Sequence, residues 1–138
     1  MPEKILDNKS RTYSVLSVDD SLLIRQLVKI SLKSNENHKI NLIEAGDGQD
    51  AYLLIKEACP DLLITDYNMP GMNGLELISK IRNEESLKPI PIILLTAEND
   101  EKMITKLCQD FNVLFLRKPF TKNRLNDVVS NIIRVFYR

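Results

Sequence analysis

No apolar run in this 138-residue sequence approaches the roughly 20 residues that a membrane-spanning helix needs. Residues 1–12 are polar and lack the apolar core of a secretion signal, so we expect a cytoplasmic protein. The two cysteines, Cys59 and Cys108, show neither metal nor redox spacing, and we interpret both as buried thiols. Repeats, low-complexity segments and Pro/Gly/Ser-rich linkers are also missing, which favours a single domain.

The sequence has no net charge, but its charges are unevenly distributed. Residues 1–100 carry five more acidic than basic residues, and residues 101–138 carry five more basic than acidic ones. The basic segment either attracts an acidic partner or forms a solvated helix face. No basic cluster is interleaved with aromatic residues, so we expect no nucleic-acid partner, and we expect no membrane partner either.

Short apolar segments alternate with amphipathic ones along the whole chain. We predict strands at residues 13–18, 40–44, 62–65, 90–95 and 113–116. We predict helices at residues 21–33, 48–58, 74–83 and 100–110, and a last helix whose apolar stripe runs from Leu125 to Phe136. All strands except the second are continuously apolar, which indicates burial on both faces. The predicted fold class is therefore α/β, a doubly wound five-stranded parallel sheet in a three-layer αβα arrangement.

Local signals add detail to this outline. Asn73 and Thr121 are suited to cap the third and the last helix. Asn112 precedes the fifth strand and tolerates the left-handed backbone conformation better than most residues. We interpret His38, in the polar stretch 34–39, as a surface residue.

Polar side chains follow four of the predicted strands directly. They are Asp19 with Asp20, Asp66, Thr96 and Lys118. The carboxyl ends of parallel strands meet at one edge of the sheet, so these groups are expected to lie together. Close carboxylates repel one another, and a hard divalent cation such as Mg²⁺ relieves the conflict.

Metal and ammonium together make a site for a phosphoryl group. The hydroxyl of Thr96 can donate to a phosphoryl oxygen, and one carboxylate can act as the nucleophile. The residues alone do not decide which carboxylate this is. The Pro- and Gly-containing loop that begins at Asp66 favours that residue.

Each of these residues also has an ordinary interpretation. Asp20 could cap the first helix, Asp66 could be a loop carboxylate, and Thr96 could cap the helix that follows it. Lys118 could be a surface charge. Taken together, the ordinary interpretations require four coincidences at four strand ends, and this favours the functional interpretation.

These motifs, in this order, resemble the response-regulator receiver family. The resemblance rests on the acidic pair, on Asp66 in Thr-Asp-Tyr-Asn-Met-Pro-Gly-Met-Asn-Gly, on Leu-Thr-Ala ending at Ala97, and on Lys118-Pro119-Phe120. The spacings agree, with 46 residues from Asp20 to Asp66, 30 more to Thr96 and 22 more to Lys118. The resemblance implies a (βα)5 flavodoxin-like receiver domain over residues 13–138, preceded by a polar tail at 1–12.

The resemblance also implies a role for each residue of the motifs. Asp66 would accept phosphate from a histidine kinase or phosphotransfer protein, with Thr96 and Lys118 as its catalytic partners. The Mg²⁺ ligands would be Asp19, Asp20, Asp66 and the backbone carbonyl of Asn68. Thr96 and Phe115 would form the switch that changes the surface of the fourth helix, fifth strand and fifth helix, and the bond before Pro119 would be cis.

Within the family, the sequence is most similar to stand-alone chemotaxis regulators of the CheY type. Asn68, two residues after Asp66, and Glu98, two after Thr96, form a pair that those proteins can carry. The switch position holds Phe115 and not Tyr, which removes a hydroxyl that a partner could use. No output domain follows the last predicted helix, so we expect output through a separate, unidentified protein.

Three alternatives remain open. One is an intermediate receiver in a multistep phosphorelay. Another is a phosphohydrolase of the haloacid-dehalogenase kind, although that class has a second Asp where this chain has Asn68. The third is a pseudo-receiver that binds partners without phosphorylation. As a receiver, the chain would be no enzyme beyond catalysing its own phosphorylation and dephosphorylation.

Overall fold

The alternating segments form five strands and five helices in the part of the chain, residues 11–137, that the computed structural model describes. The strands are β1 (Thr12–Val18), β2 (Lys39–Ala45), β3 (Leu62–Asp66), β4 (Ile92–Thr96) and β5 (Leu114–Arg117). The helices are α1 (Leu22–Lys33), α2 (Gly48–Ala58), α3 (Gly74–Arg82), α4 (Glu101–Phe111) and α5 (Lys122–Phe136). The predicted tail at 1–12 lies outside the described residues except for its last two positions, and β1 already begins at Thr12.

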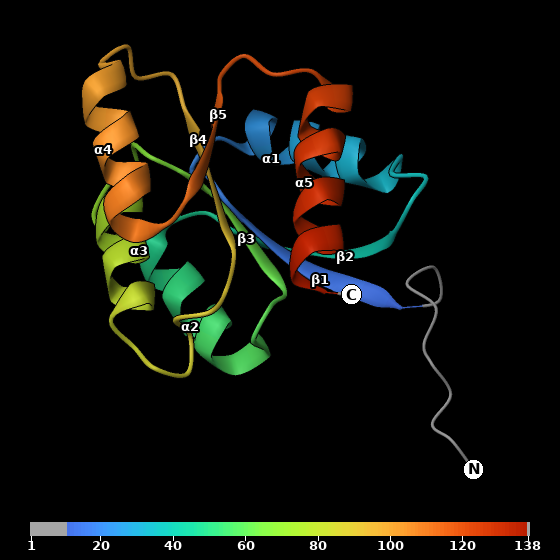
Figure 1. Ribbon diagram of the computed structural model, residues 1–138, viewed down its shortest axis with the longest axis horizontal. Coiled ribbons are helices and arrows are strands. Elements are labelled where there is room, and N and C mark those ends of the chain that lie inside the picture. Colours follow the sequence, from blue (N-terminus) through green and yellow to red (C-terminus); the bar gives the residue numbers. More distant parts are fainter. Residues whose placement is uncertain (1–10, 138) are drawn as a thin grey trace.

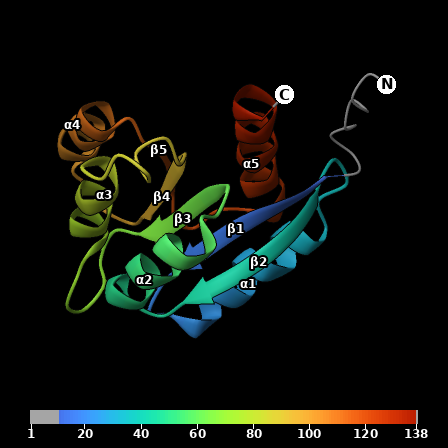
Figure 2. The same cartoon turned by 90° about the horizontal axis from the view of Figure 1, so that it is seen from below.

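The strands form one parallel sheet in the order β2-β1-β3-β4-β5, which confirms the predicted doubly wound α/β fold. The strand order reverses between β1 and β3, so their carboxyl ends flank the topological switch point. Figure 2 shows β2 and β5 at opposite edges of this sheet. The strand ends that carry Asp19, Asp66 and Lys118 therefore converge at one side of the molecule.

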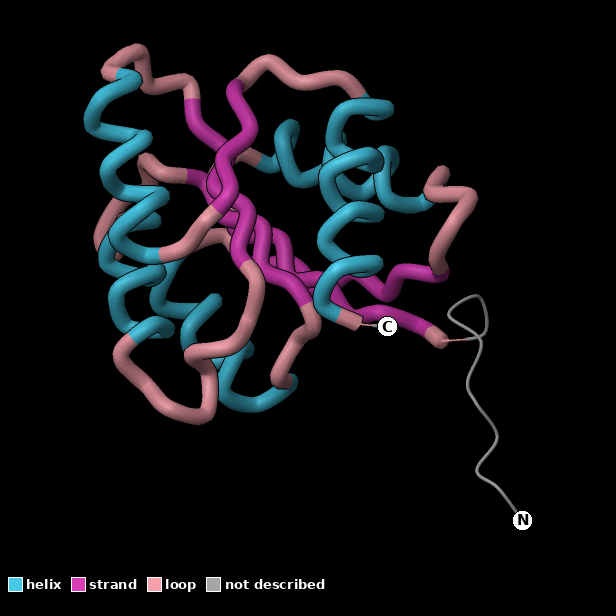
Figure 3. The backbone as a smooth tube through the Cα atoms, viewed as in Figure 1, coloured by secondary structure: helices cyan, strands magenta, loops and turns pink. Residues whose placement is uncertain are grey.

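Helices cover both faces of the sheet and make the three layers visible in Figures 1 and 3. Helices α2, α3 and α4 pack on one face, where Leu16, Leu63 and Leu94 point into the core. Helices α1 and α5 pack on the other, against the alternate residues Val15 and Ile64. Because side chains alternate along a strand, each central strand supplies both cores, which is why its sequence is continuously apolar.

The predicted caps are confirmed. The Asn73 side chain accepts the N–H of Glu76, and the Thr121 side chain accepts that of Arg124. Asn112 lies in the left-handed region with φ 54°, as expected for the turn before β5. Helix α1 is capped by Ser21 and not by Asp20, so Asp20 has no capping role there.

Two strand predictions need correction. β4 begins at Ile92 and not at residue 90, because Pro91 has no N–H to donate to the sheet. Its carbonyl still accepts the N–H of Leu63 in β3. β5 was expected to be buried on both faces, but Leu114 and Phe115 are 53% and 39% exposed. β5 is an edge strand, so only part of it is covered by helices.

The predictions for three side chains are also wrong. Cys59 is exposed, because it ends α2 in a left-handed conformation beyond the last buried turn, and Cys108 is half-buried. His38 is buried and not a surface residue. Its ring packs edge-on against the fully buried Tyr13 of β1, with 5.5 Å between the ring centroids.

His38 should make the stability depend on pH. Burial, and to a lesser extent the charge of Arg134, lowers the pKa of His38 from the ordinary 6.5. The unfolded chain therefore takes up a proton near pH 6.5, where the folded protein resists it. We expect this contribution to be fully present above pH 6.5 and lost as the pH falls through 6.5 toward the lower pKa of the folded protein.

The measurement is urea unfolding of the native protein and His38→Phe across pH 5 to 8. The difference between their free energies of unfolding should be constant at the alkaline end. Below pH 6.5 the native protein should lose stability relative to His38→Phe. His38 is the only histidine in the sequence, so its imidazole NMR signal reports the folded pKa directly. A folded pKa at or above 6.5 would contradict the prediction.

None of the helices within the described residues is long and apolar enough to span a membrane.

Candidate functional site

Three carboxylates meet at the carboxyl ends of β1 and β3. One oxygen each from Asp19, Asp20 and Asp66 can be chosen so that all three lie within 4.8 Å of one another. Asp19 and Asp66 are buried, with exposed fractions of 1% and 7%, whereas Asp20 is exposed. The structure thus brings together the acidic residues that the sequence placed at separate strand ends.

Lys118 brings a positive charge to this cluster from the residue that follows β5. Its Nζ donates to Oδ1 of Asp66 at 2.9 Å and to Oδ2 of Asp19 at 3.2 Å. The Lys118 side chain is only 18% exposed, so both ion pairs are partly shielded from water. The Lys118–Pro119 peptide bond is cis.

The charges in the cluster are not balanced. Burial raises the pKa of Asp66; the hydrogen bond from Lys118 opposes this rise, and the charge of Asp19 adds to it. Burial acts to lower the pKa of Lys118, but the two carboxylates outweigh it and the pKa is raised. Three carboxylates against one ammonium leave two negative charges when all are ionised, and all the ligands are oxygens. This set fits a hard divalent cation such as Mg²⁺.

Local hydrogen bonds hold Asp19 in place. Its Oδ1 accepts the N–H of Ser21 at 2.9 Å, where the chain turns into α1. The guanidinium of Arg25 donates to the backbone carbonyl of Asp19 at 2.6 Å and forms an ion pair with Glu44 of β2 at 3.3 Å. Sequence reasoning missed Arg25, because its main partner is a backbone carbonyl that has no signature in the sequence.

Asp66 is held by the loop that follows it. The N–H of Tyr67 donates to Asp66 Oδ1 at 2.9 Å, and the N–H of Gly74 donates to the carbonyl of Tyr67 at 2.9 Å. A Cβ at Gly74 would lie 2.2 Å from the carbonyl oxygen of Asp66, so only glycine lets α3 begin this close to the strand end. Asn68 lies in this loop and is exposed.

Thr96 and Phe115 lie on the neighbouring strands β4 and β5. Thr96 is 1% exposed, and its Oγ1 accepts the N–H of Glu98 at 2.9 Å. It does not cap α4, whose N-cap is Asp100. Phe115 is 39% exposed, so its ring does not belong to the buried core.

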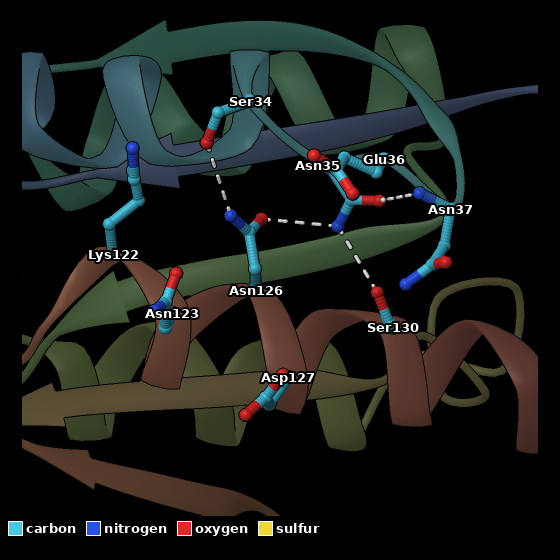
Figure 4. Close-up of a pocket in the computed structure, with 9 residues that line it drawn as sticks. All are labelled: Ser34, Asn35, Glu36, Asn37, Lys122, Asn123, Asn126, Asp127 and Ser130. Carbon is cyan, nitrogen blue, oxygen red and sulfur yellow. Dashed lines mark hydrogen bonds between the residues drawn. The ribbon is translucent and has the colours of Figure 1, made fainter.

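A separate polar pocket of about 280 Å³ lies between the segment after α1 and helix α5 (Figure 4). Asn35 donates to the side chains of Asn126 and Ser130, both at 3.1 Å, and Asn126 donates to the Ser31 carbonyl at 2.8 Å. These polar groups satisfy one another and join α1 to α5. We interpret the pocket as part of that helix contact, and it contains none of the carboxylates described above.

Comparison with known proteins shows which family the chain resembles. The sequence profile of the response regulator receiver domain matches residues 15–130. Chemotaxis protein CheY-3 of Vibrio cholerae is 34% identical over 123 residues, which cover 89% of this chain and 93% of that protein. The two-component response regulator ORR4 of Oryza sativa is 30% identical over 148 residues, and the alignment covers 94% of this chain. The alignment covers 63% of ORR4, less than two thirds of its length.

Solved structures agree with the sequence comparisons. The chemotaxis response regulator CheY4 of Vibrio cholerae superposes with a TM-score of 0.77 and 30% sequence identity. The superposition covers 88% of this chain and 99% of CheY4. Fold and sequence therefore point to the same family.

Proposed function

This chain belongs to the response regulator receiver domain family, and on that premise we propose that it accepts a phosphoryl group on Asp66 and passes the signal on through a change in its surface. One observation carries the proposal above all others. The buried carboxylate of Asp66 lies 2.9 Å from the ammonium of Lys118 and beside the carboxylates of Asp19 and Asp20. This arrangement suits a nucleophile next to a metal and a cation that neutralise a phosphoryl group.

We propose that Mg²⁺ is held by Asp19, Asp20, Asp66 and the backbone carbonyl of Asn68. When bound, Mg²⁺ neutralises negative charge on the phosphoryl oxygens. The ammonium of Lys118 does the same from the side of β5. Burial of Asp19 and Asp66 strengthens these interactions, because water screens them less.

The chemistry at Asp66 is a displacement at phosphorus. Both hydrogen bonds that its carboxylate accepts within residues 11–137 fall on Oδ1, which leaves Oδ2 to attack. The new bond joins Oδ2 to phosphorus. The bond that breaks joins phosphorus to the donor, an imidazole nitrogen of a phosphohistidine or the acyl oxygen of acetyl phosphate, and the donor leaves with the electron pair.

The switch in this proposal consists of Thr96 and Phe115. The Thr96 hydroxyl turns from Glu98 toward the phosphoryl group, and the half-exposed ring of Phe115 moves into the space that Thr96 leaves. The phosphorylated form thereby favours a second arrangement of α4, β5 and α5. Phe has no hydroxyl, so this surface must bind its partner without one at position 115.

The proposed partners follow from this chemistry. A histidine kinase or phosphotransfer protein supplies the phosphoryl group, and a separate protein reads the altered surface, both in the cytoplasm. CheY-3 is described as a chemotaxis protein and ORR4 as a two-component response regulator. Both descriptions fit a receiver that passes a signal to another protein.

Incubation with acetyl phosphate tests the proposal. With Mg²⁺ present, we expect intact-protein mass spectrometry to show an increase of one phosphoryl group that disappears on standing. Chelating the metal with EDTA should suppress the adduct, since the ammonium of Lys118 offsets only one of the three carboxylate charges that face an anionic donor. Steady turnover of an external phosphate ester would favour a phosphohydrolase instead. No adduct under any condition would favour a pseudo-receiver.

A further inference from the structure

Glu98, in the loop between β4 and α4, is held by hydrogen bonds on both sides of its backbone. Its N–H donates to Oγ1 of Thr96 at 2.9 Å. Its carbonyl accepts a hydrogen bond from the guanidinium of Arg117 at 2.8 Å. A continuous chain of contacts therefore runs from the Thr96 hydroxyl through Glu98 to Arg117.

Arg117 is well placed to control this loop. It is the last residue of β5 and the direct neighbour of Thr96 across the sheet. A second guanidinium nitrogen contacts the carboxylate of Glu101 in the first turn of α4 at 3.2 Å. The Glu101 side chain is 77% exposed, so that ion pair contributes little. The bond to the Glu98 carbonyl is partly buried and charge-assisted, and it carries most of the contact.

The side chain of Glu98 contributes to the same arrangement. Its Oε1 accepts the N–H groups of Asn99 at 3.0 Å and of Asp100 at 3.1 Å. The carboxylate is therefore engaged by the loop's own backbone. With Arg117 on the carbonyl and Thr96 on the N–H, both backbone polar groups and one carboxylate oxygen of Glu98 are tied to one loop conformation.

We propose that Arg117 is a positioning residue that holds residues 97–100 in the conformation of the unphosphorylated protein and so limits the rate of phosphorylation. The inference rests on the proposed function, because it concerns the step in which Thr96 leaves Glu98 for the phosphoryl group. When Thr96 leaves, the N–H of Glu98 loses its acceptor, and the loop must rearrange. The hydrogen bond from Arg117 opposes that rearrangement, since it fixes the other side of the same residue.

The test is Arg117→Met, which keeps an unbranched apolar stem and removes the guanidinium donors. Weakening the unphosphorylated conformation raises the population of the competent one, and the phosphorylation rate with acetyl phosphate and Mg²⁺ rises in proportion. We expect a rate about three- to tenfold above that of the native protein, the range given by the loss of one ordinary hydrogen bond, because Arg117 is partly exposed and solvent weakens the effect of its charge. Arg117→Lys should fall between the two, and Glu101→Gln should change the rate less than about twofold.

Amide hydrogen exchange of the unphosphorylated proteins gives a second readout. The N–H of Glu98 should exchange faster in Arg117→Met than in the native protein, while the core strand β3 keeps its protection. A phosphorylation rate that is unchanged or lower in Arg117→Met would overturn the proposal, whatever the exchange at Glu98. If the native protein itself gives no adduct, the proposed function fails, and the exchange rates alone then decide whether Arg117 holds the loop.

Discussion

Asp66→Asn is expected to abolish the acetyl-phosphate adduct and, at the same time, to stabilise the metal-free protein. The amide has nearly the shape of the carboxylate but is not nucleophilic, so no bond to phosphorus forms. The amide oxygen can still accept the N–H of Tyr67 and a hydrogen bond from Lys118, so the local structure should be retained. The phosphoryl group should be missing completely from the intact mass of the variant.

The stabilisation follows from the burial of Asp66 beside Asp19. Burial raises the pKa of Asp66 in the folded protein, which means that folding disfavours its charged form. Removing that charge should therefore increase the free energy of unfolding in EDTA. Under the proposed function, this cost is offset when a cation binds beside the carboxylate.

Magnesium should reverse the order of stability, so that the native protein becomes more stable than Asp66→Asn. A ligand that binds only the folded state stabilises it, by about 2.7 kcal/mol at a concentration 100-fold above Kd. The native protein should gain this stabilisation, and Asp66→Asn should gain much less because one carboxylate ligand is gone. Urea unfolding with and without Mg²⁺ measures both effects.

Asp127→Asn is the matched control. This carboxylate is exposed on α5, so the variant should be phosphorylated and stabilised by Mg²⁺ like the native protein. An adduct that persisted in Asp66→Asn would show that another residue accepts the phosphoryl group, and peptide mapping would identify it. A metal-free Asp66→Asn protein less stable than the native one would contradict the argument from burial.

The sequence was sufficient to predict the sheet and the composition of the acidic cluster. The continuously apolar runs of β1, β3 and β4 indicated strands that helices cover on both faces, and polar residues directly after parallel strands meet at one edge of the sheet. The positions of Asp19, Asp66 and Lys118 relative to one another follow from those two facts. Their individual roles in phosphorylation stay predictions.

Other features depend on contacts that leave no pattern in the sequence. His38 stands among polar residues, and its burial results from packing on Tyr13, about 25 residues earlier in the chain. Arg25 and Arg117 act on backbone carbonyls, and every residue type has a backbone carbonyl. The exposure of β5 depends on its place at the edge of the sheet, which no property of the strand itself specifies.

Arg82 is the strongest example of such a hidden contact, and its replacement should have the largest effect on stability. Its guanidinium donates to four backbone carbonyls, two in the loop before β4 and two at the end of α4 and directly after it. The acceptors are Phe111 at 2.7 Å, Ile90 at 2.6 Å, Lys88 at 2.9 Å and Asn112 at 3.0 Å. These segments lead into β4 and β5, so Arg82 fixes the start of both strands from the end of α3.

We expect Arg82→Met to lower the free energy of unfolding by about 3 kcal/mol. The carbonyls of Phe111 and Ile90 are partly buried, and each loses its partner at a cost of about 1–3 kcal/mol. The carbonyls of Lys88 and Asn112 are exposed and can bond to water, so they add little. Arg82→Lys should retain part of the stability, because an ammonium can reach only some of the four acceptors. Urea unfolding measures all three proteins.

The salt dependence of stability distinguishes the loss of these hydrogen bonds from the loss of an ordinary ion pair. Within residues 11–137, Arg82 forms no salt bridge, and burial lowers its pKa. The loss in Arg82→Met should therefore be nearly the same at low and high salt, since hydrogen bonds to carbonyls are not screened as surface ion pairs are. Arg124→Met, at an exposed arginine on α5, should change stability by less than about 0.5 kcal/mol. A loss below about 1 kcal/mol in Arg82→Met would mean that water replaces the guanidinium at the two buried carbonyls.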